Sequence, residues 1–280
     1  MPTIADHIID IPKEYYISSG VEPLHDYPSF NPYSVRDNDL IFVKTDYIVN
    51  GSFQEQFLDK IYCRFNLITG VSSYNLGRDG GDIYKVILDH PNLNKWICTN
   101  PPNIDNKKII PIPIGFQEPQ RSGGNQQFLD KVHKSSIPFK NKKDLIFMPY
   151  HDISTNSKRR EMIDFLKSLS FVVVQQTKQS IEDYYDSMNQ YKFVIGLEGR
   201  GPDIHRNYEA MLVGSIPINT KNVIQKVFEY HGADAIFLNS WRQLEVNLFN
   251  KLVKISYNDE SNNSFLKVKN HIKHIRDIIK

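Results

Sequence analysis

The strongest constraint on the fold is a regular alternation of short apolar runs with amphipathic segments. Runs rich in β-branched and aromatic residues, such as DLIFVKTDYI (39–48), KWICTN (95–100) and FVVVQQ (171–176), are typical of buried strands. Segments with apolar residues at helical spacing lie between such runs, for example FQEQFLDKIYCRF (53–65) and SIEDYYDSMNQ (180–190). Because consecutive parallel strands need a long crossover connection, the alternation predicts an α/β architecture of parallel sheets covered by helices.

The alternation occurs twice, which predicts two Rossmann-like domains. A chain of 280 residues is long for one compact domain. The polar, glycine-rich run QEPQRSGGNQQ (117–127) separates the two halves. We therefore expect an N-terminal domain of residues 1–140 that begins with an irregular arm (1–36), a C-terminal domain of residues 141–262, and a C-terminal helix within residues 263–280, near Ser264 to Ile279, that would pack back on the N-terminal domain.

Composition narrows the functional class. The net charge is only +2, and the lysines and arginines are spread along the chain instead of forming one basic patch. Both features argue against nucleic-acid binding. Cys63 and Cys98 show no CxxC or paired Cys/His spacing, so neither a disulfide framework nor a structural zinc site is expected. The N-terminus lacks the features of a signal peptide, and no segment approaches the roughly 20 apolar residues of a membrane span. We expect a soluble, cytoplasmic chain.

The segment YKFVIGLEGRGPDIHRNYEAMLVGSIPIN (191–219) carries the clearest functional pattern. Its first apolar run predicts a strand that ends at the carboxyl edge of a parallel sheet, which is where ligands bind in such sheets. Gly199 and Gly201 let backbone amides approach an anion, and Pro202 and Asp203 begin a helix whose amides and dipole face the same point. This pattern predicts a phosphate site.

Two side chains extend this interpretation to a nucleotide sugar. Arg206 can donate charge-assisted hydrogen bonds to a diphosphate, and Glu209, on the same helical face, can accept from vicinal hydroxyls. Two other interpretations stay open. The glycines could serve only as turns, with Arg206 and Glu209 paired on a solvated helix. The second interpretation is a nicotinamide-dependent oxidoreductase, although GRGPDI lacks the third glycine of the dinucleotide-binding motif.

The residues GRGPDIHRNYEAMLVGSIPI (199–218) resemble the signature of exostosin-like glycosyltransferases, in which a glycine corner, Pro-Asp, an arginine, Glu-Ala and Gly-x-Ile-Pro occur in that order. HPNLNKWICTN (90–100) and KKIIPIPIGF (107–116) are similar to the N-terminal half of short members, including ones encoded by large DNA viruses of algae. The likeness covers residues 39–252 and implies a GT-B fold, with two Rossmann-like domains facing each other across a cleft.

This resemblance implies an inverting transfer of a sugar from a UDP-sugar to a hydroxyl of a glycan or glycoprotein. Xylose is the sugar that the viral relatives favour, and the cytoplasm would be that of the host cell if the chain is viral. Gly201, Arg206 and Glu209 fall on the family's donor-binding positions, with the glutamate toward the ribose.

Further donor-binding residues are expected around this core. One of Arg159 and Arg160, which begin the helix after the second domain's first strand, should face the diphosphate. Tyr184, with Tyr185, would either flank the uracil ring or belong to the core. The full expected set is Arg159, Arg160, Gly199, Arg200, Gly201, Asp203, Arg206, Glu209 and Tyr184.

An inverting reaction needs a base from the N-terminal domain. The candidates are Asp46, after the first strand, and Asp79 and Asp82 in the loop GRDGGD, with Asp79 as first choice. The alternative is that the loop aspartates only shape a turn. Many short relatives have an aspartate directly after the second strand, where this chain reads TGVSSY. A non-catalytic sugar-nucleotide or glycan-binding module is therefore the alternative function.

No metal is expected to be required. Asp37, Asn38 and Asp39 formally spell the DxD motif of another glycosyltransferase fold, but here the three residues precede a strand instead of following one. A helix N-terminus and arginines can neutralise a leaving diphosphate without a cation. The UDP-sugar donor is thus the one small molecule that the chemistry would need.

Overall fold

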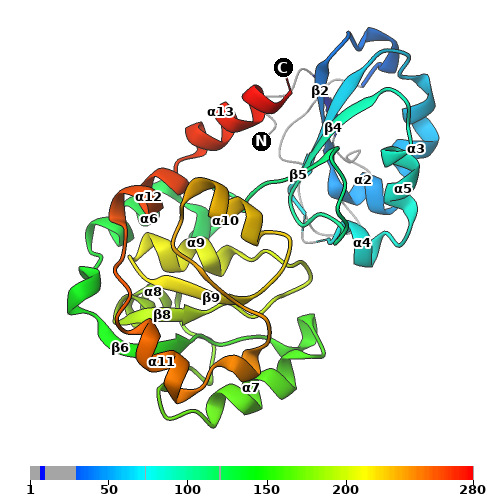
Figure 1. The fold of residues 1–280 in the computed structure, drawn as a ribbon. Coiled ribbons are helices and arrows are strands. Elements are labelled where there is room, and N and C mark those ends of the chain that lie inside the picture. Colours follow the sequence, from blue (N-terminus) through cyan, green and yellow to red (C-terminus); the bar gives the residue numbers. More distant parts are fainter. Residues whose placement is uncertain (1–6, 10–29, 73, 120, 280) are drawn as a thin grey trace. The chain divides into compact units, whose positions relative to one another are not determined.

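The computed structural model describes residues 7–9, 30–72, 74–119 and 121–279, and it divides into two compact units. Unit 1 consists of Met1–Pro113 and Lys269–Lys280, and unit 2 consists of Ile114–Val268. Each unit contains one five-stranded sheet in which all strand pairs are parallel, with helices packed on it (Figure 1). The chain is therefore an α/β protein with two Rossmann-like units, as the alternation predicts.

The sheet of unit 1 has the strand order β1-β2-β3-β4-β5, which follows the chain without a reversal. Side chains alternate between its faces. Ile41 and Val43 of β2 pack with the short helices on one face, and Leu40 and Phe42 pack on the other. The strands are β1 (His7–Ile9), β2 (Asp39–Lys44), β3 (Phe65–Gly70), β4 (Leu93–Cys98) and β5 (Ile109–Pro111), and the helices are α2 (Thr45–Val49), α3 (Ser52–Gln56), α4 (Leu76–Asp79) and α5 (Ile83–Leu88).

The C-terminal helix α13 (Val268–Ile278) packs on unit 1. Its Ile275 is buried in one cluster with Leu40 and Phe42 of β2 and with Ile68 of β3. The helix therefore covers the face of this sheet that the short helices leave open. The expected single helix near Ser264 to Ile279 is instead two helices, because α12 (Asp259–Phe265) ends before α13 begins.

The sheet of unit 2 has the order β10-β9-β8-β6-β7, and this order reverses between β6 and β8. After β7 the chain returns across β6 to place β8 on its other side. This reversal is a topological switch point, the position at which open parallel sheets bind ligands. The strands are β6 (Lys143–Met148), β7 (Val172–Val174), β8 (Tyr191–Ile195), β9 (Ile216–Thr220) and β10 (Ile236–Leu238).

Helices cover both faces of this second sheet. One layer packs on Phe147 and Val194, and the other packs on Ile146 and Phe193. Figure 1 shows α8 and α9 on the opposite side of β8 and β9 from α7 and α11. The helices are α6 (Gln126–Lys134), α7 (Arg159–Lys167), α8 (Ile181–Asn189), α9 (His205–Leu212), α10 (Gln225–His231) and α11 (Val246–Leu252).

The boundary between the units lies at Ile114 and not near residue 140, which corrects the expected domains 1–140 and 141–262. The reason is α6, which follows the glycine-rich run. Its Leu129 and Val132 are buried against Phe147 and Met188 of unit 2. The polar run 117–127 therefore belongs to unit 2, where it contains the 3-10 turn Ser122–Gly124 and the start of α6, and it is not a linker between domains.

Two segments of unit 1 differ from their predicted secondary structure. The strand expected over 39–48 ends at Lys44, where α2 begins. The helix expected over 53–65 is only the short α3 and a 3-10 turn, Leu58–Lys60. Most of their apolar residues are nevertheless buried in the core, including Phe53, Leu58 and Ile61, although Tyr62 is exposed. Most of the arm 1–36 lies outside the described residues, although 7–9 form strand β1.

Within the described part of the chain, no helix combines the length and apolar character that crossing a bilayer would require.

Candidate functional site

The candidate site lies in unit 2, at the carboxyl edge of its sheet and at the switch point. Two segments meet there, because β6 and β8 are neighbours in the sheet. One is Pro149–His151, which follows β6, and the other is the loop 196–204, which joins β8 to α9. In unit 1 the described strands run in sequential order without a switch point. The topology therefore favours unit 2 as the place for a ligand.

Arg159 holds the loop in place from beneath. Its Nε and Nη2 donate to the carbonyl oxygens of Glu198 and Leu197, each at 2.9 Å, and its Nη1 donates to that of Asp152 at 2.7 Å. The side chain is buried, and burial together with the charge of Arg206 lowers the pKa of Arg159 to about 10. Arg159 stays charged at neutral pH, and its three side-chain nitrogens donate to backbone carbonyl oxygens. It acts as a brace, whereas the sequence predicted a diphosphate ligand at Arg159 or Arg160.

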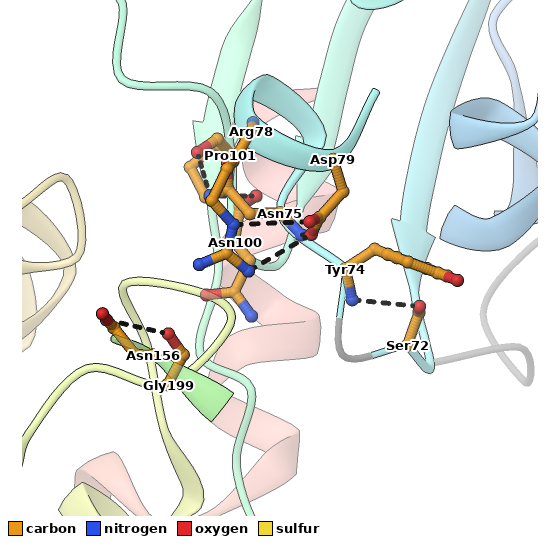
Figure 2. Close-up of polar contacts among 9 residues, drawn as sticks. All are labelled: Ser72, Tyr74, Asn75, Arg78, Asp79, Asn100, Pro101, Asn156 and Gly199. Atoms are coloured by element: carbon orange, nitrogen blue, oxygen red, sulfur yellow. Dashed lines mark hydrogen bonds and ion pairs between the residues drawn. The ribbon is translucent and has the colours of Figure 1, made fainter. Parts of the chain in front are cut away.

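Two asparagines complete the bracing of the loop. The Nδ2 of Asn156 lies 3.4 Å from the carbonyl oxygens of both Glu198 and Gly199, and the second of these contacts is drawn in Figure 2. Asn222 donates from its Nδ2 to Glu198 Oε1 at 3.1 Å and to the Pro202 carbonyl at 3.0 Å. Asn156 does not cap α7, because this helix begins only after Lys158. The loop is thus held in one conformation before any ligand arrives.

His151 joins the ends of the two central strands. Its Nδ1 lies 2.6 Å from the Pro149 carbonyl oxygen, and its Nε2 accepts from the Leu197 amide at 3.3 Å. Because a carbonyl can only accept, Nδ1 carries the proton and the ring is neutral. Burial and the positive charges of Arg206 and Arg159 lower the pKa of His151 well below its ordinary value. The imidazole therefore joins two strands without adding charge.

Asp203 is a structural residue and not the donor-binding residue that the sequence predicts. It is buried, and its carboxylate accepts from the Tyr208 hydroxyl at 2.6 Å and from the amides of Ile114 and Ile204 at 2.8 and 2.9 Å. Asn207 also donates to it, at 3.3 Å. These four bonds fix the start of α9. Burial raises the pKa of Asp203, while the hydrogen bonds oppose that shift.

Arg206, Tyr184 and Glu209 form a continuous hydrogen-bonded chain. The Tyr184 hydroxyl lies 2.6 Å from Glu209 Oε2, and Arg206 Nε donates to the same hydroxyl at 3.2 Å. Arg206 also donates from Nη2 to the Tyr150 carbonyl at 3.2 Å, and its guanidinium carbon lies 5.9 Å from the centre of the Tyr184 ring. Three of the residues that the sequence assigned to donor binding are therefore in direct contact.

The start of α9 lies beside this chain. Its N-cap residue is Ile204, and no side chain caps it among the described residues. The first-turn amides of a helix carry a partial positive charge, which Arg206 in that same turn reinforces. Gly199 and Gly201 precede this start, and a Cβ at Gly199 would lie in ordinary contact with the Arg159 Nη2, at 3.5 Å. The arrangement favours an anion, and it includes the predicted glycines.

The remaining predicted donor-binding residues are less involved. Arg160 is exposed on α7, and Arg200 is exposed in the loop. Tyr184 packs against the core cluster that contains Phe147 and Tyr185, which agrees with the core-packing alternative, and in addition it contacts Arg206 with its ring and Glu209 with its hydroxyl.

The three candidate bases of unit 1 have different environments. Asp79 ends α4, where its Oδ2 accepts from the Asn75 amide at 2.7 Å and its Oδ1 pairs with Arg78 Nε at 3.3 Å (Figure 2). Asn75 in turn caps α4 by accepting from the Arg78 amide at 2.7 Å. Asp82 is exposed and pairs with Lys85 at 2.9 Å. These contacts correspond to the turn-shaping alternative for the two loop aspartates.

Asp46 differs from the two loop aspartates. It lies in the first turn of α2, directly after β2, and its Oδ2 is buried without a hydrogen-bond partner among the described residues. At the end of the neighbouring strand β3, Val71 has a φ of 54°, which is rare for a β-branched residue. Backbone strain of this kind clusters at functional sites.

Metal ligands were not expected, and the described residues contain no group of three or more histidine, cysteine or carboxylate side chains that could hold a metal ion. The two aspartates of the formal DxD pattern bind backbone amides near the start of β2. Asp37 accepts from the Arg64 amide at 3.2 Å, and Asp39 accepts from the Arg36 amide at 2.8 Å. Both carboxylates therefore shape the turn before β2.

Several residues of the site carry no clear sequence signal. His151, Asn156 and Asn222 bind the loop through carbonyl or amide groups that only the folded chain brings near. Gly196 is a further case, because a Cβ there would clash with Asn219 Oδ1 and would lie 2.7 Å from Asn207 Oδ1. The one available signal was position, because Gly196 lies near the end of the first apolar run of segment 191–219.

The likeness of this chain to a solved structure is remote. No family model matches the chain, and no curated protein matches it. Among solved structures, the chain is similar to UDP-GlcNAc 2-epimerase from Methanocaldococcus jannaschii, with 13% sequence identity and a TM-score of 0.37 over 86% of this chain and 76% of that one. A likeness this low does not bear on the activity of this chain.

Proposed function

We propose that this chain is an inverting glycosyltransferase that moves a sugar from a UDP-sugar to a hydroxyl of a glycan. The observation that carries the proposal is the Arg206–Tyr184–Glu209 chain beside the start of α9, at the switch point of a parallel sheet. A cation next to helix amides suits a diphosphate, and a carboxylate on the same helical face suits vicinal ribose hydroxyls. A nucleotide diphosphate carries both groups.

The chemical step needs three events in balance. The acceptor hydroxyl oxygen forms a bond to the anomeric carbon, and the bond from that carbon to the β-phosphate oxygen breaks with its electron pair moving to UDP. A carboxylate takes the hydroxyl proton. Arg206 and the amides of α9 would stabilise the charge that develops on the leaving diphosphate.

For the base we favour Asp46 over Asp79 and Asp82. The carboxylate of Asp79 already accepts from a backbone amide and pairs with Arg78, and that of Asp82 pairs with Lys85. Asp46 has an oxygen without a hydrogen-bond partner among the described residues. No hydrogen bond to a described residue has to break before this oxygen of Asp46 accepts a proton, and Asp46 directly follows β2.

Binding of nucleotides tests the donor site. Calorimetry with UDP and GDP should show binding of UDP, with the affinity reduced at least tenfold in Arg206→Gln through loss of a charge-assisted contact. Arg242→Gln is the control, because Arg242 is an exposed arginine of the same unit that pairs with Glu161. Binding of GDP alone, or equal affinity in parent and Arg206→Gln, would contradict the assignment. A panel of UDP-sugars then identifies the donor, for which we propose UDP-xylose.

Turnover of the donor tests the base. Asp46→Asn should abolish transfer and donor hydrolysis while UDP binding is retained, and Asp59→Asn, an exposed aspartate of the same unit, should have no effect. Loss of turnover in Asp79→Asn or Asp82→Asn, with Asp46→Asn active, would reassign the base. A parent that binds UDP and turns over no donor would indicate the sugar-nucleotide-binding module instead.

A further inference from the structure

The ring of Tyr184 packs against the core, but core packing does not explain the contacts of its hydroxyl. It lies on α8, whose start is fixed by the Ser180 cap, with the Ser180 hydroxyl accepting from the Asp183 amide at 3.1 Å. Within the described part of the chain, the Tyr184 hydroxyl is the one group that forms hydrogen bonds with both Arg206 and Glu209. These two residues are the ones to which the proposed function assigns the diphosphate and the ribose.

The direction of the hydrogen bonds in this chain follows from the chemistry of its ends. A guanidinium can only donate, so the Tyr184 oxygen accepts from Arg206 and its proton points to Glu209. Burial and the charge of Glu209 raise the pKa of Tyr184, so its hydroxyl keeps this proton. The hydroxyl therefore separates a positive and a negative side chain that lie three residues apart on α9.

This separation determines how Glu209 can meet a ligand. The Glu209 side chain is buried, with 5% of its surface exposed, and Tyr184 holds its Oε2 at 2.6 Å. No other hydrogen bond reaches this carboxylate within the described part of the chain. Without the hydroxyl, Arg206 and Glu209 are free to pair directly, as oppositely charged side chains at this spacing do. Such a pair would take both side chains away from a nucleotide.

We infer that Tyr184 is a positioning residue that holds Glu209 for the ribose hydroxyls and so makes the site selective for ribonucleotides. The inference rests on the proposed function, because it takes UDP as the ligand of this site. It gives the tyrosine a role through Glu209 and not through contact with the substrate. It also predicts that selectivity for the 2′-hydroxyl, and not affinity alone, depends on a side chain of α8.

The test compares the affinities of UDP and 2′-deoxy-UDP by calorimetry. The parent should prefer UDP about tenfold, the amount that one hydrogen bond to a charged group supplies. In Tyr184→Phe the preference should fall to about twofold or less, mainly because UDP binds more weakly. Glu209→Gln should lose the preference too, and adding Tyr184→Phe to Glu209→Gln should change the ratio little.

Tyr257→Phe is the matched control. Tyr257 also donates a partly buried hydroxyl to α9, to the Met211 carbonyl at 3.2 Å, but it contacts neither Arg206 nor Glu209 by a hydrogen bond. This variant should keep the parent's preference, and thermal unfolding should show that all variants fold.

The outcomes separate the inference from the function on which it rests. A parent that binds UDP, with the preference unchanged in Tyr184→Phe, overturns the inference and leaves the proposed function intact. Equal weakening of both nucleotides in Tyr184→Phe does the same, because it reports a merely structural role. A parent that binds neither nucleotide overturns both.

Discussion

At the scale of single residues, the candidate site depends on polar side chains whose nitrogens form hydrogen bonds with the backbone. Arg159 and His151 both lie beneath the loop after β8, and both direct their nitrogens to the backbone. Burial and neighbouring positive charge lower the pKa of both residues. The net effect is a loop that one charged and one neutral side chain hold through hydrogen bonds to its backbone.

We predict that His151 makes the protein less stable at mildly acidic pH. The pKa of His151 is depressed in the folded state, so between the unfolded value near 6.5 and the folded value only the unfolded chain takes up a proton. The free energy of unfolding should therefore be highest above about pH 6.5 and fall as the pH drops, by up to about 1.4 kcal/mol per pH unit for this group.

Urea unfolding between pH 7.5 and 5 measures this slope. In His151→Gln the slope should be smaller than in the parent, although His90 and His274, whose pKa values burial also lowers, still contribute. An unchanged slope in the variant would show that His151 takes up its proton equally well in the folded state.

At the scale of elements, the junction of β8 with α9 and β9 leaves no room for a side chain. Gly196 donates its amide to the Ile218 carbonyl at 2.8 Å, and the side chains of Asn207 and Asn219 occupy the space where its Cβ would lie. The close approach brings α9, and with it Arg206 and Glu209, against the end of the sheet. The glycine is needed for this approach and not for a left-handed turn.

Replacing Gly196 by alanine should therefore destabilise the protein by about 1 to 3 kcal/mol, the usual cost of forcing extra volume into a packed site. The matched control is Gly70→Ala at the end of β3, where the nearest atoms to a Cβ, both of Thr99, lie at 3.6 and 3.7 Å. Thermal or urea unfolding compares the two variants. Equal stabilities would show that Asn207 and Asn219 move aside at little cost.

At the scale of the whole molecule, the chain leaves unit 1 at Pro113, builds all of unit 2, and returns to unit 1 with α13. Ile275 is the buried residue by which this helix packs on Leu40, Phe42 and Ile68. The two ends of the chain thus contribute to the same unit, and the stability of unit 1 depends on its last helix.

We predict that Ile275→Ala lowers the stability of unit 1 by about 3 kcal/mol through the cavity that it leaves. Val268→Ala, in the same helix but 64% exposed, should have almost no effect. Hydrogen exchange is the suitable measurement, because amides of β2 and β3 should lose protection while those of β8 and β9 keep it. Equal loss in both sheets would mean that the two units unfold as one.

The whole site also allows a prediction about metals. If Arg206 and the start of α9 stabilise the leaving diphosphate, donor turnover should survive treatment with EDTA. Turnover is assayed before and after chelation, with a metal-dependent glycosyltransferase as the positive control. Complete loss of turnover that manganese restores would contradict this account of the leaving group.

The sequence by itself determined the α/β class, two parallel sheets, and the segment that carries the site. These features can be predicted because each depends only on residues that lie close together in the sequence. They are the strand and helix periodicity, the glycines of GRGPDI and the order of Arg206 and Glu209. Ser180 at the start of α8 was predictable for the same reason, since a cap bonds to an amide only three residues away.

Only the tertiary structure decided which of the predicted side chains are available for chemistry. Arg159 and Asp203 were expected to bind a donor, yet carbonyls and amides distant in sequence take up their hydrogen-bonding groups. Tyr184 acquired its place between Arg206 and Glu209 because α8 and α9 pack side by side on the sheet. Such partners depend on proximity in three dimensions, and this proximity cannot be predicted from the periodicity of one sequence.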